Sequence, residues 1–90
     1  MLGFGFSDEL KLKVRKLLKK DRKKVEIIHK KVKDIVKCSP DEIMHYKNLR
    51  HDMKGLKRVH IDAHFVLTFR VDVKNNFVLF VDFDHHDNIY

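Results

Sequence analysis

The sequence predicts an α+β fold in which an N-terminal helical hairpin packs on one face of an antiparallel β-sheet, in the order β-α-α-β-β-β. Three observations support this prediction. Apolar residues recur at helical spacing over residues 10–36, they alternate with polar residues from residue 56 onward, and residues 77–83 form an almost continuous apolar run. A period of 3.6 residues indicates amphipathic helices, whereas a period of two and a short apolar run indicate strands.

The first half of the chain predicts one short strand followed by two helices. Apolar residues alternate in LGFGF, residues 2–6, which is typical of a strand. Ser7 is a good N-cap for the helix that follows, because its hydroxyl can accept from a free backbone N–H. The run KKDRKK, residues 19–24, has no apolar side chain and predicts a tight connection with Asp21 as a cap. The sequence CSP at residues 38–40 ends the second helix.

The second half of the chain predicts a connection and three strands. Residues 41–55 show no clear period, which indicates a loop with some helical turn. The segments LKRVHI (56–61) and HFVLTFRV (64–71) alternate as strands do, and the apolar run 77–83 is typical of a central strand. Residues 74–76, KNN, suit the hairpin turn between the last two strands, since Asn tolerates the left-handed conformation.

Length and composition predict one small domain, residues 1–90, with a shallow site. A chain of 90 residues can bury one core but not a deep private cavity. The lone Cys38 cannot form an internal disulfide and fits a reducing compartment. No apolar stretch approaches the roughly 20 residues that a membrane helix needs, and the N-terminus lacks a signal-peptide pattern. We therefore expect a cytoplasmic protein.

Positive charge is concentrated in the predicted hairpin. Residues 11–37 carry 13 Lys and Arg against 3 acidic residues, a net charge of +10, while the whole chain carries +7. Six of the seven histidines follow that segment. A cationic surface of this kind attracts RNA phosphates in a sequence-independent, salt-sensitive way.

The alternation of the strands predicts which side chains share a face. If Phe65, Leu67 and Phe69 point toward the helices, the opposite face is exposed at the intervening positions, which include Val66 and Thr68. That face is expected to carry two histidines and two arginines: His60, His64, Arg58 and Arg70. The tail DHHDNIY, residues 84–90, leaves the last strand and can fold over this face.

Histidine, arginine and tyrosine around a groove suit RNA cleavage by the RNA's own 2′-hydroxyl, without a metal. A neutral imidazole can take the 2′-OH proton, and a protonated imidazole can give a proton to the leaving 5′-oxygen. Arginine can hold the phosphate and the charge that develops on it, and an aromatic ring can stack on a base.

Other interpretations of these residues stay open at this point. Single histidines on strands are commonly surface residues, which we expect for His29 and His45, and a lysine-rich hairpin can be a solvated helical surface. The ligand types of a zinc site are present in His60, His64, His86 and Asp87. The His-x3-His spacing straddles a turn between strands, however, instead of a helix face, so we expect no bound metal.

The order and spacing of three segments resemble the RelE superfamily of toxins, and most closely its YafQ-like branch. These segments are KGLKRVHI (54–61), HFVLTFRV (64–71) and the C-terminal HHDNIY (85–90), and the resemblance covers essentially the whole chain. It implies a RelE-like fold and a ribosome-dependent mRNA endonuclease without a cofactor. It further implies the toxin of a type II toxin–antitoxin pair, with a cognate antitoxin, mRNA and the ribosomal A site as partners.

The resemblance also implies roles for individual residues. His60 falls where relatives place a basic or histidine catalytic residue, and His64 falls where the YafQ-like branch has an acidic one. His86 matches the C-terminal catalytic histidine of that branch, Tyr90 its terminal aromatic residue, and His51 lies near its loop histidine. The predicted RNA-binding residues are Lys54, Lys57, Arg58 and Arg70.

The chain also departs from the family pattern. Val66 stands where many relatives carry an active-site arginine, and Leu56 replaces a common aromatic residue. Two hypotheses therefore remain: an active endonuclease, and a basic RNA- or ribosome-binding module with weak or lost catalysis.

Overall fold

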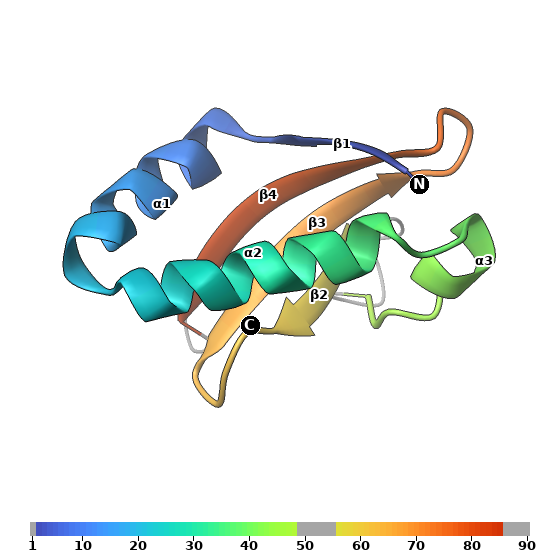
Figure 1. The fold of residues 1–90 in the computed structure, drawn as a ribbon. Helices are drawn as coiled ribbons and strands as arrows, with labels where there is room; N and C mark the ends of the chain where they lie inside the picture. The colour runs from blue at the N-terminus through green and yellow to red at the C-terminus, as the bar shows by residue number, and fades with distance from the viewer. Residues whose placement is uncertain (1, 49–55, 86–90) are drawn as a thin grey trace.

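The computed structural model, which describes residues 2–48 and 56–85, confirms the α+β class. Helices pack on a four-stranded sheet of order β1-β4-β3-β2 (Figure 1). None of the described helices is long and apolar enough to span a membrane. The elements in chain order are β1 (Gly3–Phe6), α1 (Asp8–Lys20), α2 (Arg22–Val36), α3 (Pro40–Ile43), β2 (Leu56–His60), β3 (Phe65–Asp72) and β4 (Phe77–His85).

The sheet is mixed, so the prediction of a wholly antiparallel sheet is wrong at its first strand. β2, β3 and β4 are antiparallel neighbours, as predicted, but β1 runs parallel to β4, with Gly3 opposite Phe77 and Phe6 opposite Phe80. Parallel neighbours need a long crossover connection. The helices and the two other strands lie between β1 and β4 in the chain and provide that connection (Figure 1).

One hydrophobic core lies between the helices and the sheet. The helix α2 crosses over the sheet (Figure 1) and buries a stripe of residues at helical spacing: Val25, Ile28, Val32, Ile35 and Val36. From the sheet, Leu67, Phe69 and Phe80 are fully buried, and the Phe69 and Phe80 rings lie 6.0 Å apart. The helical stripe and the inward positions of β3 confirm the predicted periodicities.

The opposite face of β3 is less open than the alternation predicts. Val66 is completely buried and Thr68 is 4% exposed, whereas Arg70 is exposed as predicted. The Thr68 hydroxyl donates to the backbone oxygen of Asp82 at 3.3 Å. Val66 and Thr68 therefore offer little surface to a ligand on this face, whereas Arg70, two residues before the end of β3, does.

The predicted caps are confirmed. Ser7 accepts from the backbone N–H of Leu10 at the start of α1. Asp21 closes α1 by donating its N–H to the Leu17 carbonyl, and its carboxylate accepts from Lys24 N at 3.1 Å at the start of α2. Asn76 adopts the expected left-handed conformation in the β3–β4 turn, with φ of 50°. One side chain, Asp21, therefore joins the two helices.

Replacing Asp21 by Ala should destabilise the fold by about 1 kcal/mol, because the N-terminus of α2 loses its side-chain acceptor. Urea unfolding followed by far-UV circular dichroism measures this difference. Asp34→Ala is a matched control, since Asp34 is an exposed acid within α2 whose carboxylate caps nothing. Equal losses in the two variants would contradict the capping role.

Candidate functional site

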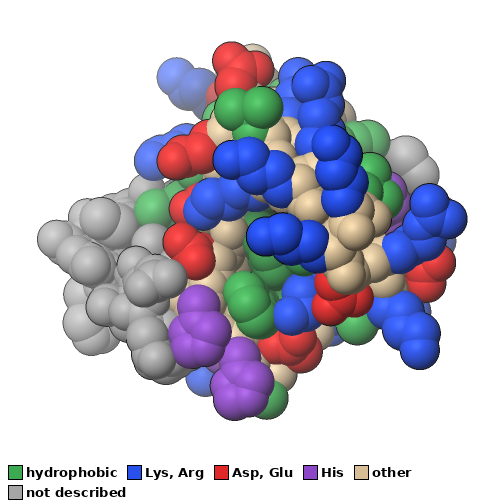
Figure 2. All heavy atoms as spheres, turned by 90° about the vertical axis from the view of Figure 1, so that its left-hand side faces the viewer, with side chains coloured by type: hydrophobic (Ala, Val, Ile, Leu, Met, Phe, Trp, Pro, Cys, Tyr) green, Lys and Arg blue, Asp and Glu red, His purple; other side chains and the backbone are tan. Residues whose placement is uncertain are grey.

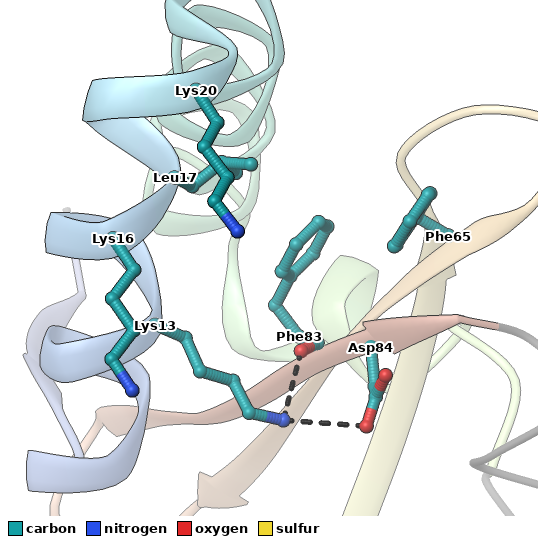
Figure 3. Close-up of a pocket in the computed structure, with 7 residues that line it drawn as sticks. All are labelled: Lys13, Lys16, Leu17, Lys20, Phe65, Phe83 and Asp84. Atoms are coloured by element: carbon teal, nitrogen blue, oxygen red, sulfur yellow. Dashed lines mark hydrogen bonds and ion pairs between the residues drawn. The ribbon is translucent and has the colours of Figure 1, made fainter.

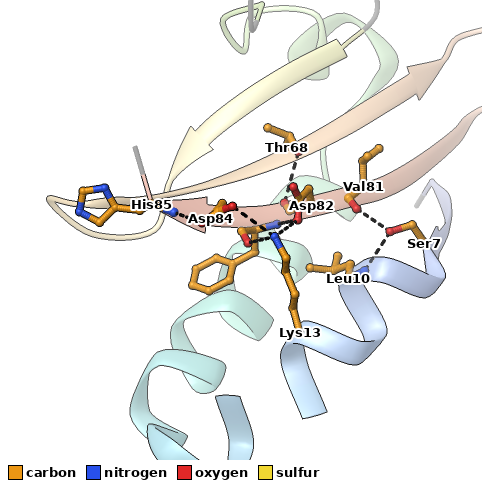
Figure 4. Close-up of polar contacts among 9 residues, drawn as sticks. Ser7, Leu10, Lys13, Thr68, Val81, Asp82, Asp84 and His85 are labelled. Atoms are coloured by element: carbon orange, nitrogen blue, oxygen red, sulfur yellow. Dashed lines mark hydrogen bonds and ion pairs between the residues drawn. The ribbon is translucent and has the colours of Figure 1, made fainter. Parts of the chain in front are cut away.

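The helix α1 covers the outer edge of β4 where no strand pairs with it. β1 pairs only with residues 77–80 of β4, so among the described residues the second half of β4 has no neighbouring strand on that side. The Ser7 hydroxyl donates to the carbonyl of Val81 (Figure 4), and Lys13 Nζ donates to the carbonyl of Phe83 at 3.2 Å (Figure 3). Side chains from α1 thus satisfy edge carbonyls that would otherwise lack a protein partner.

Lys13 also pairs with two carboxylates at the end of β4. Its Nζ lies 2.7 Å from Asp82 Oδ1 and 3.3 Å from Asp84 Oδ2 (Figure 4). Burial lowers the pKa of Lys13, but the hydrogen bonds and negative charges of Asp82 and Asp84 outweigh that effect, so the pKa is raised above its ordinary value. The ammonium group stays charged and fixes α1 against the end of β4.

A groove of about 240 Å³ opens between α1 and this end of the sheet (Figure 3). Figure 2 shows Lys and Arg side chains gathered around hydrophobic ones on this face. Across the part of the chain that the structure describes, Lys16 and Lys20 form no ion pair. The groove is lined by Lys13, Lys16, Leu17, Lys20, Phe65, Phe83 and Asp84.

Two histidines stack next to this groove. The rings of His64 and His85 are nearly parallel, at 8°, with centroids 5.8 Å apart. The Phe65 ring meets His85 edge-on at 5.4 Å and stacks on Phe83 at 5.0 Å. Since Phe65 and Phe83 line the groove, the histidine pair and the groove share a wall.

Asp62 and Lys24 hold the β2–β3 turn that carries His64. Asp62 Oδ1 accepts from the backbone N–H groups of His64 at 2.8 Å and Phe65 at 2.9 Å. Lys24 Nζ lies 3.6 Å from Asp62 Oδ2 and 3.8 Å from the centroid of the Phe65 ring. The His64 and Phe65 N–H groups, with the charge of Lys24, hold the pKa of Asp62 below its ordinary value. These contacts position His64 against His85.

The remaining predicted residues of the described strands take different positions. His60 is exposed at the end of β2, the end of the sheet where His64 lies. Arg58 Nε donates to the Asn48 carbonyl at 3.3 Å, so this arginine is tied to the segment that precedes β2. Arg70 is exposed near the other end of β3.

Lys57, one of the predicted RNA-binding residues, is buried in the structure instead of exposed on a face that RNA could reach. It is 4% exposed, and its Nζ donates to the Met44 carbonyl, 3.2 Å away, at the end of α3. Lys57 faces the same side of β2 as Val59, toward the helices, because alternate strand residues share a face. Its aliphatic stem packs in the apolar layer, and a backbone oxygen satisfies its ammonium group.

Four predicted residues, His51, Lys54, His86 and Tyr90, lie outside the described residues and stay predictions. Among the residues that the structure does describe, no cluster of three or more His, Cys, Asp or Glu side chains could hold a metal ion.

Sequence reasoning missed the groove and the role of His85. The sequence offers Lys16 and Lys20 only as two of many lysines of the predicted hairpin, and it predicts Phe65 as a core residue. A signal was present in the sequence: Lys13, Lys16, Leu17 and Lys20 have the spacing of a single helix face. Which part of the sheet that face meets was not readable from the sequence.

The arrangement of helices packed on a four-stranded mixed sheet is found in a solved structure. The fold matches the crystal structure of a metal-bound toxin from Helicobacter pylori with a TM-score of 0.73 over the full length of both chains, at 20% identity. That degree of identity establishes the fold alone.

Sequence comparisons establish the family. The chain is 56% identical over 77 residues to a protein of Methanocaldococcus jannaschii named "Putative toxin RelE4", which covers 86% of this chain and 78% of the relative. It is 49% identical over 82 residues to an uncharacterized protein of Methanosarcina mazei, covering 91% of each chain. No family model matches. The chain belongs to the RelE toxin family and is a RelE-type toxin of a toxin–antitoxin system, a class that has a cognate antitoxin as partner.

Replacing Asp62 by Ala should destabilise the fold by about 1 kcal/mol at neutral pH, because two backbone N–H groups lose their acceptor. Asp62→Asn keeps an acceptor oxygen, so its free energy of unfolding should fall by less than that of Asp62→Ala. A carboxyl whose pKa is lower in the folded state stabilises the fold above its unfolded-state pKa and loses that contribution as the pH falls through the folded-state pKa. The difference between the native protein and Asp62→Ala should therefore narrow between about pH 6 and about pH 3.

Urea unfolding of the two variants and the native protein across that pH range measures the effect. A difference that stays constant with pH, or a loss in Asp62→Asn as large as in Asp62→Ala, would contradict the role assigned to the carboxylate.

Proposed function

We propose that this RelE-type toxin is a metal-independent endoribonuclease of the YafQ-like kind, which cleaves mRNA on the ribosome in the cytoplasm. The observation that carries the proposal is the stacked pair of His64 and His85 beside a lysine-rimmed groove. Imidazoles beside a cationic groove combine proton transfer with phosphate binding.

In the proposed reaction the RNA attacks itself. A neutral imidazole accepts the proton of the 2′-hydroxyl, and the 2′-oxygen forms a bond to phosphorus. The bond from phosphorus to the 5′-oxygen breaks, and a protonated imidazole gives its proton to that oxygen. The products are a 2′,3′-cyclic phosphate and a free 5′-hydroxyl, with no net change in protons.

The histidines at this end of the sheet fill these two roles. His64 lies in the β2–β3 turn, directly before β3, and His60 lies at the end of β2, so both can reach a phosphate placed at this end. His86, Tyr90 and His51 stay in the proposal because of the family resemblance: His86 as acid or base, and Tyr90 as an orienting or stacking group.

A second function is favoured by two observations. Val66, which stands where many relatives carry an arginine, is completely buried and offers nothing to a phosphate. Arg58 is bound to the Asn48 carbonyl. A chain with fewer cations around its histidines is also suited to binding RNA or the ribosome through its helices without cutting.

Replacing His64 or His60 by Ala should lower cleavage of ribosome-bound mRNA by about 100- to 10,000-fold, the usual contribution of an acid–base group. Primer extension on messages from cells with induced expression measures the cuts. His29→Ala is the matched control, since His29 is exposed on α2 and lies outside the histidine cluster.

Intact messages under full expression of the native protein would rule out the endonuclease. RNA binding that weakens with salt and survives both histidine substitutions, without growth arrest, would then support the non-catalytic module.

A further inference from the structure

We infer that the groove between α1 and the end of the sheet holds one nucleotide of single-stranded RNA beside the cleaved linkage. Its base lies against the floor of Leu17, Phe65 and Phe83, and a flanking phosphate lies between Lys16 and Lys20. RNA is taken as the substrate from the proposed function, on which the inference rests. The inference adds a subsite that lies outside the group of histidines formed by His60, His64 and His85.

The size and floor of the groove suit a single base. Its volume of about 240 Å³ is below the roughly 300–1,000 Å³ of pockets that enclose drug-sized ligands, so it has room for one ring system. Phe83 is almost buried and Phe65 is half-buried, and the part of each ring that borders the groove is hydrocarbon. Such a floor takes up the apolar, aromatic part of a nucleotide.

The rim suits a phosphate. Lys16 and Lys20 lie one helical turn apart on α1 and both line the groove. In Figure 3 the Lys20 ammonium group points toward Phe83, whereas the Lys16 side chain runs along the helix beside Lys13. Neither ammonium group is neutralised by a carboxylate of the described residues, whereas Lys13 is held by Asp82 and Asp84. A pair of available cations over an aromatic floor is the arrangement with which proteins hold single-stranded nucleic acid.

The charges of the groove orient the nucleotide. Lys13 and Asp84 pair with each other at 3.3 Å on the β4 side of the groove, so that side offers a phosphate no cation that is not already paired. The phosphate therefore lies at the end near Lys16 and Lys20, and the base points toward the sheet. Phe65 touches both the groove and His85, so the next linkage of the strand reaches the histidine pair. This continuity favours RNA as the occupant over a segment of the antitoxin.

Binding of RNA that cannot be cut tests the inference apart from catalysis. The probe is a single-stranded oligoribonucleotide of about ten nucleotides with 2′-O-methyl groups throughout, because it lacks the attacking hydroxyl. The double variant Lys16→Gln/Lys20→Gln should bind it about 25-fold more weakly at about 0.1 M salt. The slope of log K against log salt should flatten by about 1.4, as expected when two phosphate contacts are lost from a single strand. Fluorescence anisotropy measures both quantities.

The matched control is Lys11→Gln/Arg15→Gln. These two residues have the same spacing, lie on the opposite face of the same helix, and are exposed, so the change in net charge is identical. The affinity of the control for the probe should fall by less than about 3-fold, because charges a helix diameter away from the groove are screened at this salt concentration.

A single abasic site, moved along the probe, tests the floor. At one position it should weaken binding by the native protein about 5-fold or more. In Lys16→Gln/Lys20→Gln the abasic site at that position should cause no further loss of affinity, because the nucleotide no longer occupies the groove. In the control variant it should weaken binding as much as in the native protein.

Equal losses in the two double variants would overturn the inference, since only overall charge would then matter. Unchanged RNA binding, with a weaker complex between Lys16→Gln/Lys20→Gln and the co-expressed antitoxin, would assign the groove to that protein instead. If the groove variant loses RNA binding but the native protein leaves all messages intact, the subsite stands and the proposed cleavage fails.

Discussion

The structure depends on how α1 replaces a missing strand at the edge of the sheet. β1 is four residues long and covers only the first half of β4, and an uncovered edge presents unpaired backbone groups. Ser7 and Lys13 bond the carbonyls of Val81 and Phe83 along the other half. Each ion pair of Lys13 is partly exposed and contributes only about 0–1 kcal/mol. Together these contacts hold α1 alongside the edge of the sheet. The groove lies between the side chains of α1 and those of β3 and β4.

A β-bulge in β4 decides which side chains meet α1. Thr68 pairs with Asp82 but Phe69 pairs with Phe80, so Val81 is an extra residue on β4. An extra residue reverses the alternation beyond it. As a result Phe83 and His85 lie opposite Leu67 and Phe65 on the helix side. Without the bulge, Asp82 and Asp84 would occupy those places and bring two carboxylates into the apolar layer.

The sequence predicts the elements well because each local signal agrees with the fold. The helical stripe, the caps at Ser7 and Asp21, and the turn at Asn76 depend on neighbouring residues only. The parallel direction of β1 depends on distant parts of the chain. The bulge could not be predicted from the sequence, because residues 77–81 are all apolar. A bulge shows in a sequence as a break in the alternation of apolar and polar residues, and this run has no such alternation. The prediction placed His64 at the correct end of the sheet, but its partner His85 depends on that bulge.

The position of the histidines follows from a single aromatic ring. Phe65 stacks on Phe83, meets His85 with its edge, and lies under the ammonium group of Lys24, which also pairs with Asp62. A displacement of this ring would therefore move the turn that carries His64, the stacked histidine pair and the floor of the groove together. A chain of 90 residues has no room for a deep cavity that would enclose reactive groups. Contacts with a shared aromatic ring hold the histidines in place instead.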